Sequence, residues 1–131
     1  MTLPSKAKMR GTKVAALAIG SLGLILHLAV AVYGAGQGDY LLIVGLFVWS
    51  SLPYLLGILL ACVLKRPIIA FCGMLMPLVL DCFNIYGVFV TSTSSTAVVA
   101  LLWMPLWNIL MIQPVGLAIG WWVAKGPLGT R

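Results

Sequence analysis

Charged side chains are scarce in this chain of 131 residues, and acidic ones are the scarcest. Eight lysines and arginines and two acids together make up 8% of the residues, whereas a soluble domain has about a quarter. Hydrophobic residues make up 63%. Because so few charges cannot cover the surface of a soluble domain, the composition excludes that class and indicates an integral membrane protein.

Most chemistry-bearing residues are also rare. The chain has no glutamate, a single histidine and three cysteines, none of which form a CxxC pair. Paired catalytic carboxylates, a zinc site and a thiol-redox centre therefore lack the residues they need. We predict a protein that is not an enzyme, with no catalytic residues, no metal site and no cofactor. The net charge of +6 does not predict a nucleic-acid partner, because the cations flank apolar runs.

Long apolar runs are what the chain does contain. A bilayer core about 30 Å thick needs roughly 20 helical residues. Four runs meet that length, so we predict an all-α, up-down bundle of four transmembrane helices forming one domain over residues 1–131. The linkers between them are short, and the hydroxyl-rich one before the fourth run is suited to capping a helix. The predicted spans cover residues 12–34, 40–64, 67–90 and 97–124.

The cations are all on one side of this four-span arrangement. They fall in the N-terminal segment, the middle linker and the C-terminal segment, whereas Asp39 lies in a linker on the other side. The positive-inside rule therefore predicts cytoplasmic termini, with the cations facing anionic lipids of a bacterial inner membrane. A cleaved signal peptide is the alternative for the first run, but that run exceeds the usual apolar length of about 7–15 residues.

Polar residues recur at one depth within the predicted spans. His27 and Asp81 are the ionisable ones, and their depths differ by only about 3 Å at 1.5 Å per residue. Ser50, Asn84 and Asn108 lie close to the same layer. Since an ionisable group within lipid costs about 2.5–3.5 kcal/mol, these five residues form a candidate proton, cation or polar-ligand site. The alternative is a set of hydrogen bonds that only joins the helices.

Small residues and prolines predict how the helices pack. Gly20 and Gly23 lie on one stripe of the first span together with His27, and Gly116 and Gly120 form a GxxxG pair in the fourth. Such positions allow close approach of another helix. Prolines within three of the spans predict kinks, because each removes a backbone hydrogen bond. They are Pro53, Pro77, Pro105 and Pro114.

Two hypotheses for function remain open at this stage. Trp103 and Trp107 share a helical face and are candidates for contact with a partner or an apolar ligand. The first hypothesis is a small membrane protein acting through helix–helix contacts, either as an accessory subunit or as an immunity-type protective protein. The second is an oligomeric transporter or channel for protons or cations that uses His27 and Asp81. Both imply that another membrane protein or a second copy is the partner.

Overall fold

The computed structural model describes residues 6–34, 40–91 and 97–126, and every regular element in these ranges is helical. Four helical stretches of 20 to 25 residues are long and apolar enough to cross a membrane, which agrees with the four spans predicted. The chain is therefore described as an all-helical integral membrane protein. Asp39 and nearly all of the hydroxyl-rich linker lie outside the described residues, so their predicted roles stay predictions.

The first three spans are continuous helices joined in chain order. Helix α1 covers Lys6–Gly34 and begins before the predicted span, because its first turns carry the basic segment. Helix α2 covers Tyr40–Cys62, two residues shorter than predicted. Helix α3 covers Pro67–Tyr86, with the proline in its first turn, and continues as a π-helical turn, η1, at Gly87–Thr91.

The fourth span consists of three elements. It runs from α4 (Ala97–Trp107) through a π-helical turn, η2 (Asn108–Ile112), into α5 (Gln113–Lys125). The backbone N–H of Gln113 bonds to the carbonyl of Asn108, which closes the wider i→i+5 ring. Prolines lie inside α2, α3 and α4 at Pro53, Pro77 and Pro105. The bends predicted for these positions stay predictions.

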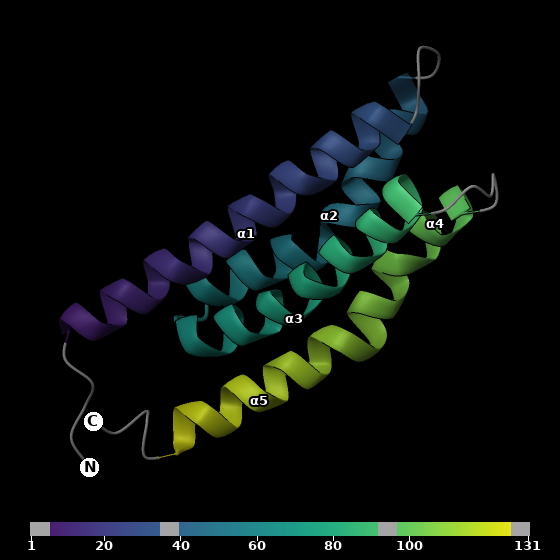
Figure 1. Cartoon of the computed structure of the whole chain (residues 1–131). Helices are drawn as coiled ribbons and strands as arrows, with labels where there is room; N and C mark the ends of the chain where they lie inside the picture. The colour runs from purple at the N-terminus through teal and green to yellow at the C-terminus, as the bar shows by residue number, and fades with distance from the viewer. Residues whose placement is uncertain (1–5, 35–39, 92–96, 127–131) are drawn as a thin grey trace.

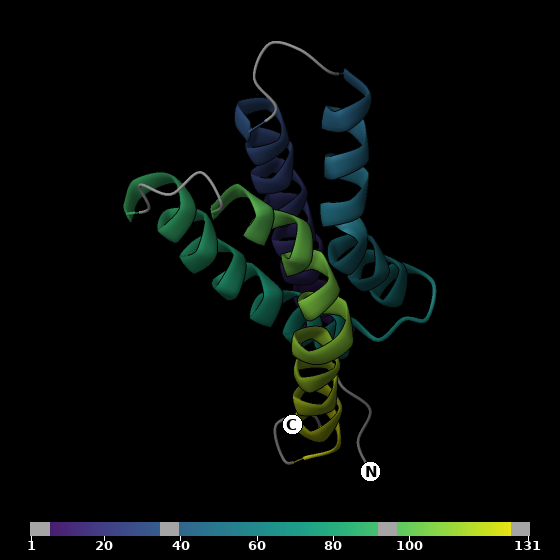
Figure 2. The same cartoon turned by 90° about the vertical axis from the view of Figure 1, so that its right-hand side faces the viewer.

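The helices run alternately up and down (Figure 1). The start of α1, the turn between α2 and α3, and the end of α5 lie at one end of the bundle. In the view turned by 90°, the run of α4, η2 and α5 lies in front of α1 (Figure 2). The start of α2 and the end of α3 lie on opposite sides of this run. Which side of a membrane each end faces stays a prediction from the charge distribution.

The core lies between α1, α2 and α3, with α5 packed against α3. Tyr54 and Met74 are its largest fully buried hydrophobic side chains. Small residues around them allow the backbones to approach. The ring of Tyr54 occupies the space where a Cβ on Gly23 would stand, and a Cβ on Gly20 would lie 2.7 Å from Ile58 Cγ1.

The contact between α3 and α5 is closest at the predicted GxxxG pair. A Cβ on Gly116 would lie 2.6 Å from the carbonyl oxygen of Cys72. A Cβ on Gly120 would lie 2.8 Å from the Cα of Ile69. Because backbone atoms cannot move aside as a flexible side chain does, only glycine fits at these two positions.

Candidate functional site

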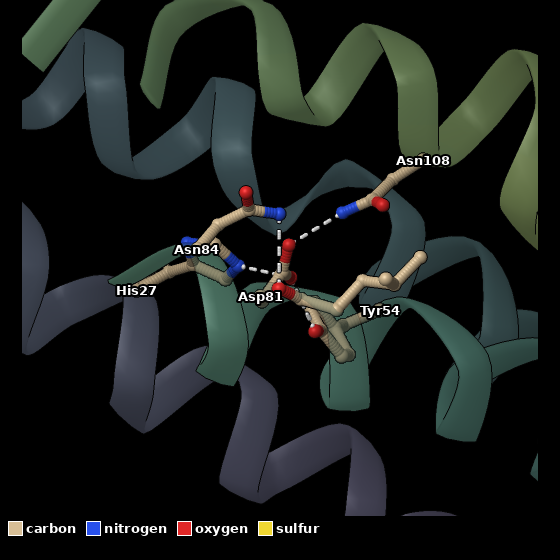
Figure 3. A network of polar contacts seen from close by, with 6 residues as sticks. His27, Tyr54, Asp81, Asn84 and Asn108 are labelled. Atoms are coloured by element: carbon tan, nitrogen blue, oxygen red, sulfur yellow. Dashed lines mark hydrogen bonds and ion pairs between the residues drawn. The ribbon is translucent and has the colours of Figure 1, made fainter. Parts of the chain in front are cut away.

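Asp81 of α3 is the centre of a buried polar network (Figure 3). Its side chain is 0% exposed. The hydroxyl of Tyr54 donates to Oδ2 at 2.6 Å, and Nε2 of His27 lies 2.8 Å from the same oxygen. Nδ2 of Asn108 donates to Oδ1 at 2.7 Å. One carboxylate therefore joins α1, α2, α3 and η2.

The partners of Asp81 match the chemistry of an ionised carboxylate. Such a group only accepts hydrogen bonds, and the phenol of Tyr54 and the amide nitrogen of Asn108 can each donate to it. Nε2 of His27 donates when it carries the ring proton, either in a neutral tautomer or in the imidazolium form. The contact of Nε2 with Asp81 is compatible with both charge states of the histidine, and the pair is ionic only in the second.

Neighbouring backbone positions bring these side chains together. Gly23 leaves room for the ring of Tyr54 against α1, and His27 follows one turn later on the same stripe. The rings of His27 and Tyr54 then lie tilted against each other, with centroids 5.5 Å apart. Asn108 opens the π-helical turn η2 and is buried there. A π-helical turn shifts the register of a helix, and such turns are frequent at functional sites.

The remaining predicted polar residues are not part of this network. Asn84 is exposed, and its amide donates to the carbonyl of Leu80 in its own helix at 3.0 Å. Asn84 follows Asp81 by three residues, so its side chain points about 60° away from that of Asp81 around the helix axis. This explains why the two side chains separate. Ser50 is buried, but it is not among the hydrogen-bond partners of Asp81. Beside it, Ser51 Oγ is the buried side-chain atom of the described residues that lacks a hydrogen-bond partner.

Tyr54 is the network member that sequence reasoning did not identify. Its aromatic ring is apolar, but a phenol buried in a membrane needs a hydrogen-bond partner. The sequence feature that could have identified Tyr54 is its position next to Pro53 and one turn after Ser50 and Ser51. Gln113 is another buried polar residue outside the five candidate site residues. It is buried, and its Nε2 donates to the carbonyl of Pro53 at 2.6 Å, which joins α5 to α2.

The predicted aromatic pair lies on the outside of the bundle. Trp103 and Trp107 are both exposed. A third tryptophan, Trp49, donates its indole N–H to the carbonyl of Leu102 at 3.0 Å and so links α2 to α4. This carbonyl lies one turn before Pro105, where a helix loses regular hydrogen bonding, so the indole supplies a donor close to the break.

Metal-ligating side chains do not gather in the part of the chain that is described. No group of three or more histidine, cysteine or acidic residues comes together there. Cys62, Cys72 and Cys82 are free thiols. The polar network is thus the strongest candidate site that these residues form.

Comparison with known proteins yields no relative. No family model matches the sequence. No curated protein and no solved structure matches it significantly. The chemistry of the site is therefore argued from its own geometry.

Proposed function

We propose that this chain is a small non-enzymatic, multi-pass membrane protein that acts through helix–helix contacts. The observation that supports the proposal is the occupation of both oxygens of Asp81 by partners from three other segments. Groups held in this way join the helices of a bundle and so stabilise it. They also have few free hydrogen-bonding positions left for a substrate. The protein would then act through its outer surface, as an accessory subunit of a larger complex or as an immunity-type protective protein.

The outer face of the fourth span is the surface we propose for the partner. Large apolar side chains stand exposed along α4 and η2 at helical spacing. Two of them are tryptophans, which are enriched where partners bind. We propose another membrane protein, or a second copy of this chain, as the partner. The residues are Trp103, Trp107, Leu110 and Met111.

Site-specific photocrosslinking in intact membranes tests this proposal. A benzoylphenylalanine at position 107 is compared with one at position 25, where the exposed Ile25 points outward from α1. We expect one discrete product at position 107, either with a larger protein or at twice the mass of the 14.0 kDa chain, and none at position 25. Equal labelling at both positions, or only lipid adducts at position 107, would contradict a specific contact there.

A proton- or cation-linked transporter or channel is the second candidate. It is favoured by the contact of His27 and Asp81, because an ionisable pair within a membrane marks a proton or ion pathway in many transporters. His27 can gain or lose a proton at Nδ1 while Nε2 stays on the carboxylate. Such a protein would form an oligomer, since four helices rarely enclose a pathway alone.

One substitution separates the two candidates. In a transporter, Asp81→Asn abolishes transport in vesicles and leaves thermal stability in detergent near that of the wild type. In a structural network, Asp81→Asn lowers thermal stability, because an amide nitrogen cannot accept the hydrogen bonds that a carboxylate oxygen accepts. His27→Ala lowers it as well, because it leaves Asp81 with one hydrogen bond fewer. We also propose that the basic end of the bundle faces the anionic cytoplasmic leaflet of a bacterial inner membrane.

A further inference from the structure

A strongly polar side chain is exposed within the third membrane-spanning stretch. Asn84 of α3 belongs to the stretch Pro67–Thr91, which is long and apolar enough to cross a membrane, and yet it is exposed. At 1.5 Å per residue the stretch is about 37 Å long, so it extends about 4 Å beyond each side of a hydrocarbon core of about 30 Å. Asn84 precedes Thr91 by about 10 Å along the helix. Its amide therefore lies within the hydrocarbon and not at the water interface.

The amide of Asn84 has hydrogen-bonding capacity that its own chain does not use. A primary amide has two N–H donors and one carbonyl oxygen that accepts. One N–H donates to the carbonyl of Leu80 at 3.0 Å. Among the described residues, the second N–H and Oδ1 have no partner. Because lipid tails neither donate nor accept hydrogen bonds, these two groups call for a partner from another polypeptide.

The backbone beside this amide is open to close approach. Gly87 lies one turn after Asn84 on the same side of the helix, and a Cβ there would meet nothing within 4 Å. This differs from Gly116 and Gly120, whose space is filled by α3. Glycine weakens a helix relative to alanine, and no described part of the chain packs against Gly87 to require it. The end of α3 also lies at the edge of the bundle (Figure 2).

We infer that the face of α3 that carries Asn84 and Gly87 binds the same face of a second copy of this chain. The charge distribution predicts one orientation for every copy. A two-fold axis along the membrane normal then places the two copies of Asn84 at the same depth. Their amides are complementary, because the free N–H of each can donate to Oδ1 of the other. An unlike partner would need its own polar group at that depth, whereas a second copy supplies one by symmetry.

Energy transfer between labelled chains in vesicles tests this contact. Chains with a donor or an acceptor dye at the C-terminus are reconstituted in phosphatidylcholine and phosphatidylglycerol at falling ratios of protein to lipid. We expect transfer above the level of random proximity. Asn84→Leu should weaken the association about tenfold, equivalent to about 1.4 kcal/mol, and Asn84→Gln should weaken it less because it keeps the amide. Phe83→Leu is the matched control, since Phe83 is exposed at the same depth and points about 100° away around the helix.

A second pair of variants tests the close approach of the two helices. Gly87→Leu should weaken the association, whereas Gly45→Leu, at an open position on α2, should leave it unchanged. Thermal unfolding checks that each variant is folded, which we expect for Asn84→Leu because the amide bonds only within its own helix. Transfer at the level of random proximity in the wild type, or equal association of the wild type and Asn84→Leu, would overturn the inference. This outcome is separate from crosslinking at position 107, which reports on α4.

Discussion

At the scale of single residues, the polar network depends on one acceptor with several donors. Asp81 is fully buried, and Tyr54, His27 and Asn108 reach it from separate segments. Removing a donor leaves a carboxylate oxygen with one hydrogen bond fewer, whereas removing the acceptor affects three partners at once. Individual substitutions should therefore differ in size and should not be additive.

Tyr54→Phe isolates one of these bonds. We expect the free energy of unfolding to fall by about 1–2 kcal/mol, because the phenylalanine keeps the ring packed on Gly23 and removes only the donor to Asp81. Thermal unfolding in detergent measures the change. Tyr33→Phe is the control, since Tyr33 is exposed. Equal stability of both variants would show that the Tyr54 hydroxyl contributes nothing to the bundle.

The members of the network were only partly predictable from sequence. His27, Asp81 and Asn108 could be assigned to one layer, because depth follows from counting residues along a helix. Asn84 was expected there too, but the direction of a side chain depends on helix rotation, which residue counting does not give. Tyr54 was missed because its ring is apolar and its single hydroxyl carries the contact.

At the scale of elements, the turn between α2 and α3 has an unusual residue at its centre. Lys65 has a positive φ of 52°, and the N–H of Arg66 bonds to the carbonyl of Leu60 at 3.2 Å. A residue in the left-handed conformation just after the end of a helix is usually glycine. A lysine at that position carries backbone strain that glycine would not.

Lys65→Gly should therefore stabilise the protein. We expect a gain of about 1 kcal/mol in the free energy of unfolding, because the left-handed conformation costs about 1–2 kcal/mol for a residue with a Cβ. Thermal unfolding in detergent is the measurement. Arg66→Gly serves as the control, since Arg66 has a φ of −114° and gains no relief. A loss of stability with Lys65→Gly would contradict this explanation.

Where α3 contacts α5, replacing a glycine should destabilise the protein, whereas introducing one at Lys65 should stabilise it. Gly116→Ala should lower the free energy of unfolding by about 1–3 kcal/mol, because its Cβ would stand 2.6 Å from a backbone oxygen of Cys72. Gly45→Ala is the matched control in an open position. Comparable melting temperatures for the two variants would mean that α3 and α5 are not held this closely.

The elements themselves were more predictable than their internal breaks. Four spans follow from the apolar runs, since run length alone decides whether a helix can cross a bilayer. The π-helical turn at Asn108–Ile112 does not follow from composition. It lies between Pro105 and Pro114 and is followed by Gln113, whose Nε2 donates to the carbonyl of Pro53.

At the scale of the whole molecule, the predicted basic side of the membrane protein is consistent with how the ends of the helices are arranged. The start of α1, the turn at Lys65 and the end of α5 lie at one end of the bundle (Figure 1). Lys125 in the last turn also lies over the ring of Trp121, with its Nζ 3.8 Å from the ring centroid. Cations at the C-terminal end of a helix interact favourably with the helix dipole, and an aromatic ring there suits the membrane interface.

Topology reporters test the orientation of this end. We expect a C-terminal green fluorescent protein fusion to fluoresce and a C-terminal alkaline phosphatase fusion to be inactive, because the positive-inside rule assigns both ends of the chain to the cytoplasm. Replacing Lys65 and Arg66 with asparagine should weaken that preference and raise phosphatase activity. The reverse pattern in the unmodified chain would contradict the assignment.

The position of Asn108 has a consequence for the order of events during synthesis. Asp81 and Asn108 are 27 positions apart in the chain, and Asn108 belongs to the last span to be made. At about 5–20 residues per second, the ribosome produces Asn108 about 1–5 s after Asp81. During that interval His27 and Tyr54, which are already synthesised, are the members of the network available to shield the carboxylate. In the nascent chain, Asp81 thus has only the partners from the first two spans, His27 and Tyr54. The network is complete only when the last span brings Asn108.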